Sequence, residues 1–232
     1  MDRARTGSNP RAIEDMVDYS RLRRTMVDNQ LRTSDITDWR ILDAMNRVPR
    51  EHFVPRHQVP FAYSETQIEL SPARAMPKPA DFARLVQLAD ITSQDVVLDI
   101  ACGTGYSTAV LSLLANAVVA VESDASLAGK ANELLTELDI GNAAVVAGPI
   151  EEGVAREAPF DVIILEGAVD AVPPALFDQL RDGGKLVAVI GAGNAAVAHR
   201  YIRSGNDVAA VTSFNASLPV LGSFAPAPAF VF

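Results

Sequence analysis

A glycine-rich turn between a strand-like run and a helix-like run is the feature that most constrains the fold of this chain. Residues 96–100 are apolar and mostly β-branched, apart from Asp99, and the turn that follows them contains only small residues up to Gly105. Small residues let the backbone approach a nucleotide closely, and the next helix offers free N–H groups. The sequence therefore predicts that a nucleotide-type cofactor binds at residues 99–105.

Strand-like and helix-like segments alternate around this turn. The strand-like runs are residues 95–100, 117–122, 143–147, 160–165 and 185–190, and the helix-like segments are residues 106–114, 126–138 and 174–180. Such alternation is typical of an α/β fold with a doubly wound, mostly parallel sheet, as in Rossmann-like domains. Two further runs, residues 207–214 and 228–232, predict an antiparallel pair at the C-terminal edge of the sheet.

Upstream of the α/β pattern the chain has a different character. Residues 1–15 are expected to be a flexible leader, and residues 16–80 a helical and proline-rich segment that covers the site; residues 81–232 then form the cofactor-binding domain. Within the N-terminal segment, Ile36, Trp39, Leu42 and Met45 predict one face of a helix over residues 36–47, and residues 49–79 are expected to be irregular.

Composition excludes several classes of partner. The net charge of −9 argues against a nucleic acid, and the basic cluster at Arg21, Arg23, Arg24 and Arg32 is interpreted as a solvated helical face. No run is long enough to cross a membrane, and residues 1–16, which contain no apolar core, are not expected to act as a secretory signal. The single cysteine, Cys102, cannot form an intrachain disulfide, so a cytoplasmic location is expected. The oligomeric state stays open.

Two carboxylates narrow the choice of cofactor. Asp99 stands just before the turn, where it would repel a pyrophosphate but attract the cationic amino-acid portion of S-adenosyl-L-methionine. Glu122 ends the second strand, where its oxygens could accept ribose hydroxyls. Thr108 also stands where a dinucleotide fingerprint requires Gly or Ala. The sequence therefore favours S-adenosyl-L-methionine over NAD.

The chain resembles the protein-L-isoaspartate O-methyltransferase family from about residue 26 to residue 174. The matching segments are Met26-Val27, Asn29-Gln30-Leu31, Ala44-Met45, Val48-Pro49-Arg50-Glu51, Phe53-Val54-Pro55, Ala62-Tyr63, Val97-Leu98-Asp99, Gly103-Thr104-Gly105-Tyr106 and Ala158-Pro159-Phe160-Asp161. The N-terminal matches matter most, because general methyltransferases lack them.

The resemblance implies a class I methyltransferase fold and a role in protein repair. In that family the carboxylate of an isomerised aspartate, in a peptide or protein, attacks the sulfonium methyl and becomes a methyl ester that later collapses to a succinimide. A carboxylate is already anionic at neutral pH, so such a reaction needs positioning and exclusion of water but no general base.

The chain departs from the family pattern at three places. Pro77 stands at the position of the active-site serine and Ala75 at that of a nearby threonine, while Lys78, beside them, could attract a carboxylate. Pro149 and Ile150 follow Gly148 where the family has Gly-Asp-Gly. Ala101 replaces the first glycine of the loop, a small-for-small change interpreted as neutral.

The predicted site therefore has two parts. Pro77 and Lys78 mark the catalytic loop, and the expected cofactor contacts are Asp99, Ala101, Gly103, Gly105, Tyr106, Glu122, Pro149, Ile150 and Glu166. No metal is expected, although His52 and His57 lie near Glu51 and Glu65. Cys102 is interpreted as a packing residue, and His199 as a surface or helix-face residue.

The principal hypothesis is an isoaspartyl or related carboxyl O-methyltransferase. A relative that binds the cofactor or a protein partner without isoaspartyl methylation is the main alternative, since Pro77 and Pro149 replace a hydroxyl and a carboxylate. A methyltransferase for a small acid and a nicotinamide enzyme remain further alternatives.

Overall fold

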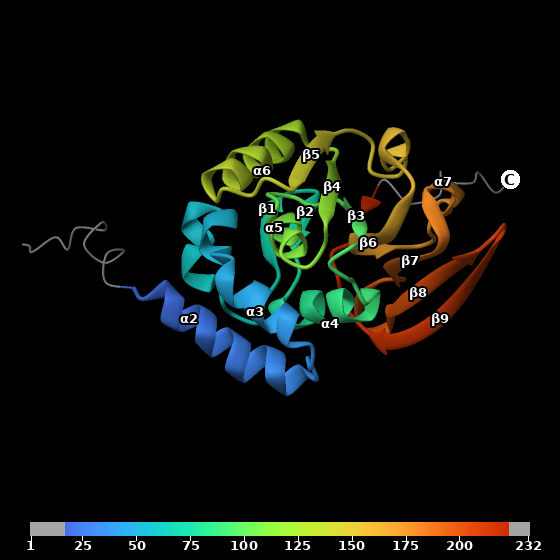
Figure 1. The fold of residues 1–232 in the computed structure, drawn as a ribbon. Helices are drawn as coiled ribbons and strands as arrows, with labels where there is room; N and C mark the ends of the chain where they lie inside the picture. Colours follow the sequence, from blue (N-terminus) through green and yellow to red (C-terminus); the bar gives the residue numbers. More distant parts are fainter. Residues whose placement is uncertain (1–16, 223–232) are drawn as a thin grey trace, which may run out of the picture.

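A seven-stranded sheet forms the centre of the molecule (Figure 1) in the computed structural model, which describes residues 17–222. The strand order is β5-β4-β3-β6-β7-β8-β9, with β3 to β7 parallel and the last two strands antiparallel. The strands are β3 (Val96–Ile100), β4 (Ala117–Glu122), β5 (Ala143–Ala147), β6 (Phe160–Val169), β7 (Leu180–Ile190), β8 (Val197–Ser204) and β9 (Asp207–Asn215). The predicted doubly wound fold with an antiparallel C-terminal edge is confirmed.

The chain changes direction across the sheet next to β3. It runs outward from β3 through β4 to β5, and then returns to the other side of β3 to form β6 and β7. Ligands of open α/β sheets bind beyond the carboxyl ends of the strands at such a switch point. The end of β3, which carries Asp99, is therefore where the topology predicts a site.

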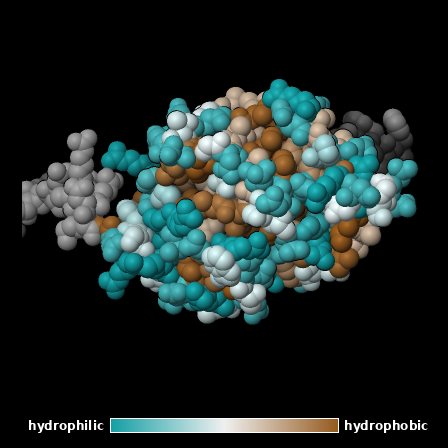
Figure 2. All heavy atoms as spheres, viewed as in Figure 1, coloured by the Kyte–Doolittle hydropathy of each residue, from teal (hydrophilic) through white to brown (hydrophobic). Residues whose placement is uncertain are grey.

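Helices cover the two faces of the sheet unequally. Helices α4 (Pro79–Ala89), α5 (Tyr106–Ser112) and α6 (Ala125–Glu137) pack into one hydrophobic core with one face. The other face packs against α7 (Pro174–Asp178) and residues 150–158 in a second core. On the side drawn in Figure 2, polar residues are interspersed with apolar ones over the surface.

The N-terminal segment joins the first of these cores. It consists of α2 (Tyr19–Met26), a π-helical turn η1 (Val27–Leu31), the 3-10 turn η2 (Arg32–Ser34), α3 (Trp39–Arg47), the 3-10 helices η3 (Arg50–Phe53) and η4 (Arg56–Phe61), and an antiparallel hairpin of β1 (Ile68–Ser71) and β2 (Arg74–Met76). Met26, Met45 and Phe53 are buried together with residues of α4 and α5. Figure 1 shows the hairpin beside α5.

The helix predicted over residues 36–47 begins later than expected. Asp38 caps α3, since its Oδ1 accepts a hydrogen bond of 2.9 Å from the backbone N of Arg40, so the helix begins at Trp39 rather than at residue 36. The buried residues of the helix follow a 3.6-residue period. Trp39, assigned to the buried face by a three-residue spacing, is 71% exposed.

The proline-rich stretch is more ordered than the sequence predicted. It contains η3, η4 and the hairpin, and α4 follows it directly with Pro79 in its first turn, where a missing N–H costs nothing. The basic cluster is also only partly a solvated face. Arg32 pairs with Asp28 in solvent, but Arg23 is largely buried and donates to the Tyr63 hydroxyl at 2.9 Å.

The C-terminal edge has a different partner from the predicted one. Strand β9 pairs with β8, which the sequence did not identify, and His199 lies on β8 rather than on a helix. The predicted strand at residues 228–232 lies outside the described residues. Strand β6 is four residues longer than expected, so Glu166 lies within it. None of the helices between residues 17 and 222 is long and apolar enough to cross a membrane.

Candidate active site

The glycine-rich turn has the backbone that its sequence predicts. Gly103 has φ +58° and Gly105, which caps α5, has φ +90°, values that L side chains rarely adopt. A Cβ at Gly103 would lie 2.6 Å from Leu70 Cδ1, and one at Gly105 would lie 3.0 Å from Ala131 Cβ. Both glycines are therefore favoured by their backbone conformation, and Gly105 also by its close packing against Ala131.

Ala101 is not the neutral replacement that the sequence suggested. Its φ is +65°, in the left-handed region where the missing glycine would sit without strain. Holding an L residue there costs about 1–2 kcal/mol. The turn therefore carries backbone strain next to the predicted cofactor position.

Asp99 lies fully buried behind this turn. Its Oδ2 accepts hydrogen bonds from Ser107 Oγ at 2.8 Å and Thr108 Oγ1 at 2.7 Å, while its Oδ1 has no partner. Burial raises the pKa of Asp99 to about 6, the two hydroxyl donors oppose that rise, and the charge of Glu122 adds to it. Thr108 stands where a dinucleotide-binding motif would have Gly or Ala, and in the structure it donates a hydrogen bond to Asp99.

Glu122 is already fully hydrogen-bonded. Its Oε1 accepts from Asp124 N and its Oε2 from Gly103 N, at 3.0 Å and 2.9 Å, and Arg74 Nε lies 3.0 Å and 3.1 Å from the two oxygens. Arg74 also donates to Ser123 Oγ at 2.7 Å. The carboxylate that was expected to accept ribose hydroxyls is therefore paired with a buried arginine from β2.

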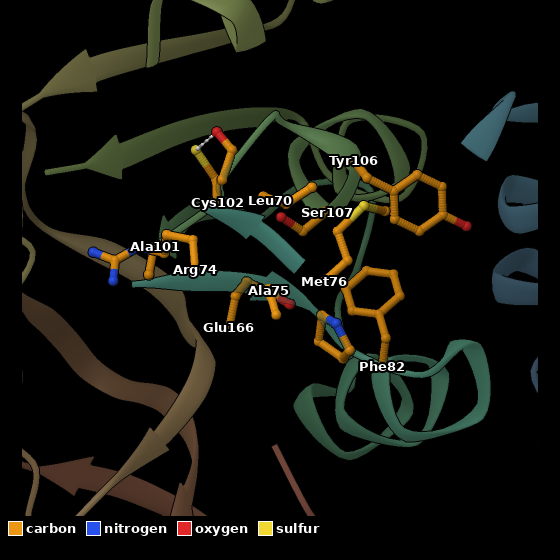
Figure 3. A pocket seen from close by; sticks show the side chains of 12 residues that line it. Leu70, Arg74, Ala75, Met76, Phe82, Ala101, Cys102, Tyr106, Ser107 and Glu166 are labelled. Carbon is orange, nitrogen blue, oxygen red and sulfur yellow. Dashed lines mark hydrogen bonds between the residues drawn. The ribbon is translucent and has the colours of Figure 1, made fainter. Parts of the chain in front are cut away.

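A cavity separates the glycine-rich turn from the β1–β2 hairpin (Figure 3). Its free volume is about 20 Å³, room for about one water molecule, so the cavity is narrow in this conformation. The residues that line it are Leu70, Arg74, Ala75, Met76, Pro77, Phe82, Ala101, Cys102, Gly103, Tyr106, Ser107 and Glu166. The fold thus brings the predicted catalytic loop and the predicted cofactor loop to one cavity.

Some predicted residues lie outside this cavity. Lys78 caps α4 without lining it, and its charge lowers the pKa of Asp81, which burial raises. Pro149 is exposed beyond the end of β5, and Ile150 is buried in the second core. The preceding Gly148 donates its N–H to the backbone oxygen of Glu122 at 3.0 Å, so the segment lies close to the site.

Glu166 projects from the carboxyl end of β6 into the cavity. Glu166 is 4% exposed, and neither of its carboxyl oxygens has a hydrogen-bond partner. Burial raises the pKa of Glu166 well above its ordinary value, the charge of Asp99 raises it further, and Arg50 opposes both. The sequence predicted Glu166 as a site residue, but its unpaired state follows only from the tertiary structure.

Arg50 is a residue of the site that sequence reasoning did not single out. It is completely buried, with its Nη2 donating to Pro77 O at 2.7 Å and its Nε to Ala62 O at 2.8 Å. The guanidinium also lies 4.7 Å from the centre of the Tyr106 ring. Arg50 therefore links the loop at Pro77 to the N-terminal segment by a hydrogen bond. The sequence motif at Val48–Glu51, which contains Arg50, could have identified this residue.

Tyr106 and Cys102 contribute mainly to packing. The Tyr106 ring packs against Phe53 and Phe82, each with 5.7 Å between ring centres. Burial raises the pKa of the Cys102 thiol well above its ordinary value, so the thiol stays protonated. His52 and His57 are exposed, and the part of the chain that the structure describes holds no group of three metal-ligating side chains.

Comparison with known proteins identifies a family. The sequence model of protein-L-isoaspartate(D-aspartate) O-methyltransferase matches residues 21–220. A protein-L-isoaspartate O-methyltransferase of Koribacter versatilis is 39% identical over 180 residues, covering 78% of this chain and 81% of that protein. Protein-L-isoaspartate O-methyltransferase 2 of Shewanella sediminis is 42% identical over 173 residues, covering 75% and 71% of the two chains.

Solved structures agree in fold. A protein-L-isoaspartate O-methyltransferase structure has a TM-score of 0.75 at 24% identity, covering 86% of this chain and 66% of that one. A Plasmodium falciparum structure described as a putative enzyme of this kind, in complex with S-adenosyl-L-homocysteine, has a TM-score of 0.74 at 20% identity, covering 87% and 98%. At these identities the likeness concerns the fold.

Proposed function

The chain belongs to the protein-L-isoaspartate(D-aspartate) O-methyltransferase family, and on that premise we propose that it transfers a methyl group from S-adenosyl-L-methionine to the carboxylate of an isomerised aspartate in a peptide or protein. The observation that carries this proposal is the cavity between the glycine-rich turn and the β1–β2 hairpin. It joins the two segments on which cofactor and substrate would have to meet.

The residues at the carboxyl ends of β3 and β4 are suited to hold the cofactor. The buried Oδ1 of Asp99 has no hydrogen-bond partner and could accept a hydrogen bond from the cofactor. Gly103 keeps the turn free of a side chain. Glu122, Gly105, Ala101 and the neighbouring residues Tyr106, Pro149 and Ile150 complete the proposed contacts. Glu122 can accept ribose hydroxyls only after Arg74 releases it.

The proposed methyl transfer requires the protein mainly to position the two reactants. When bound, S-adenosyl-L-methionine supplies an electrophilic methyl group on sulfur. The substrate carboxylate is ionised at neutral pH and attacks without a base. Arg50 holds the backbone of Pro77 in place, and apolar residues such as Met76 and Phe82 exclude water from the cavity.

Lys78 is proposed to attract the substrate carboxylate from outside the cavity. It follows Pro77 in the chain and is half-buried at the start of α4. An exposed or half-buried cation of this kind acts mainly on the rate of encounter. A Lys78→Ala variant would then raise KM for the peptide without changing cofactor affinity, and an unchanged KM would remove Lys78 from the site.

The function is tested by calorimetric titration with S-adenosyl-L-methionine and by a methyl-transfer assay. The substrate is an isoaspartyl peptide, and the matched control is the same peptide with an ordinary aspartate. Methylation of the isoaspartyl peptide alone is expected. Methylation of neither peptide would contradict the proposal.

A second candidate function is favoured by two observations. Pro77 lacks the hydroxyl of the family's active-site serine, and Glu122, the predicted ribose acceptor, is paired with Arg74. Both would suit a family member that binds the cofactor or a protein partner without isoaspartyl methylation. Cofactor binding without turnover would support this candidate over the first.

A further inference from the structure

We propose that Glu166 determines substrate specificity at this site, because its carboxyl group donates a hydrogen bond to one oxygen of the substrate carboxylate, in place of the hydroxyl that Pro77 lacks. The inference rests on the function proposed above and names the group that receives the substrate. It replaces the sequence-based prediction that Glu166 contacts the cofactor.

The backbone of β6 directs Glu166 into the cavity. Residues 165–167 of β6 lie opposite the single residue Ala188 of β7, so the strand is irregular where Glu166 stands. Figure 3 shows its side chain beside Ala75, on the hairpin side of the cavity, and Pro77 lines the same space. Glu166 therefore occupies the side of the cavity where the substrate loop lies.

The neighbouring buried carboxylates all have partners, but Glu166 has none. Glu122 accepts two backbone N–H groups and the Arg74 guanidinium, and Asp99 accepts two hydroxyl groups on Oδ2 while its Oδ1 is unpaired. Both oxygens of Glu166 are buried and unpaired. Since buried polar groups are almost always hydrogen-bonded, a carboxyl group left open in a cavity is suited to a ligand.

Burial, together with the charge of Asp99, favours the acid form of Glu166. Asp99 faces it from β3 and Arg50 from η3, and burial outweighs the attraction of that arginine, so the pKa of Glu166 lies well above its ordinary value. The Cys102 thiol is protonated and carries no charge. Arg74 forms its ion pair with Glu122 and not with Glu166. Two hydroxyl donors stabilise the ionised form of Asp99, whereas Glu166 has no donor, so Glu166 is the carboxyl group of the two that favours the protonated form.

Other donors that line the cavity are engaged or turned away. The hydroxyl of Ser107 donates to Asp99. In Figure 3 the Tyr106 hydroxyl points away from Glu166, and the Arg74 guanidinium extends to the opposite side. Ala75 and Pro77 have no donor at all. Arg50 Nη1 is also unpaired, but Arg50 does not line the cavity, so a protonated Glu166 is the lining side chain left to donate to a substrate carboxylate.

The reaction balances with Glu166 as a spectator donor. One substrate oxygen accepts its hydrogen bond, and the other uses a lone pair to form the new bond to the methyl carbon. The bond between sulfur and that carbon breaks with its electrons on sulfur. The negative carboxylate and the positive sulfonium are both neutralised, so Glu166 keeps its proton throughout.

The test compares wild type with Glu166→Gln, which keeps a donor without a charge, and Glu166→Ala, which removes the donor. Each protein is saturated with S-adenosyl-L-homocysteine and titrated with the isoaspartyl peptide in a calorimeter. Loss of a hydrogen bond to a charged group should weaken peptide binding by about 10-fold or more in the alanine variant. The glutamine variant should stay within about 3-fold of wild type.

The pH dependence gives a second readout. Wild-type affinity for the peptide should fall as the pH rises through the raised pKa of Glu166, because the ionised form repels the substrate carboxylate. The Glu166→Gln variant should show no such fall. A structural role for Glu166 would move the melting temperature but would not produce this difference between the two pH profiles.

The outcomes separate the possible failures. Equal peptide affinity in wild type and Glu166→Ala would overturn the role of Glu166 while leaving the proposed function in place. A matching loss of affinity for S-adenosyl-L-homocysteine would assign Glu166 to the cofactor instead. A wild-type complex that neither binds nor methylates the peptide would overturn the proposed function, and this inference with it.

Discussion

Arg74 and Glu122 show how strongly a single pair of residues can influence this site. Their side chains are 6% and 0% exposed, and the pair lies at the predicted ribose position. Removing one partner of a buried ion pair leaves an uncompensated charge, which usually costs about 3–5 kcal/mol. The two backbone N–H groups that also bind Glu122 reduce that cost here.

Replacing Arg74 by glutamine is expected to tighten cofactor binding. The change frees the Glu122 oxygens for the ribose hydroxyls, so the Kd for S-adenosyl-L-homocysteine should fall by about 10-fold, which corresponds to one ordinary hydrogen bond. The cofactor-free protein should lose about 3 kcal/mol of stability. Isothermal calorimetry and urea denaturation measure the two effects.

Arg156→Gln is the matched control for this prediction. Arg156 pairs with Glu157 in solvent, with 70% of its side chain exposed, so neither the Kd nor the stability should change measurably. Weaker cofactor binding in the Arg74 variant would mean that Arg74 helps to hold the cofactor rather than competing with it.

At the level of elements, the turn between β3 and α5 carries the site. Its glycines were predicted from the need for a close backbone approach, and the structure adds a second reason. Gly105 lies against α6, so a side chain at that position would have to push Ala131 away by a few tenths of an ångström. The N-terminal hairpin approaches the same turn through Leu70, which contacts the space above Gly103.

Gly105→Ala is expected to destabilise the protein by about 1–3 kcal/mol. The new methyl group would meet Ala131 at 3.0 Å, and the backbone would remain at φ +90°. Gly129→Ala is the control, since Gly129 lies within α6 with open space around it and should gain about 1 kcal/mol from helix propensity. Urea denaturation with opposite signs for the two variants would confirm the expectation, whereas equal effects would contradict it.

For the whole molecule, the important fact is that the N-terminal segment and the cofactor domain share a core. Met26, Met45 and Phe53 are buried with Phe82 and Leu111 in one hydrophobic cluster. A ligand bound in the cavity therefore contacts elements from both halves of the chain. Binding should stabilise the described part of the protein as one unit.

S-adenosyl-L-homocysteine is accordingly expected to raise the melting temperature. At a concentration 100 times its Kd it should add about 2.7 kcal/mol, which corresponds to roughly 5–10 °C for a protein of this size. Scanning calorimetry measures the shift. NAD at the same concentration serves as the control, because Asp99 and Thr108 disfavour a dinucleotide. A larger shift with NAD would reverse the choice of cofactor.

Local pattern was enough to predict the α/β fold and the cofactor turn. Strand-like runs, helix-like runs and glycines act through neighbouring residues, so their periods and spacings are visible in the chain itself. The positions of Asp99 and Glu122 at strand ends followed for the same reason. The strand β8 was missed because its eight residues carry no clear alternation, and burial there is decided by neighbours in the sheet.

Only the tertiary structure decided which partners the side chains of the site contact. Arg74 reaches Glu122 across 48 positions, Arg50 reaches Pro77 across 27, and Glu166 is left without a partner among residues that arrive from four different elements. No local period encodes such contacts, because they depend on how whole elements pack. The sequence by itself determined where a cofactor turn would form, and packing determined which of the nearby carboxyl groups are paired and which remains open to a ligand.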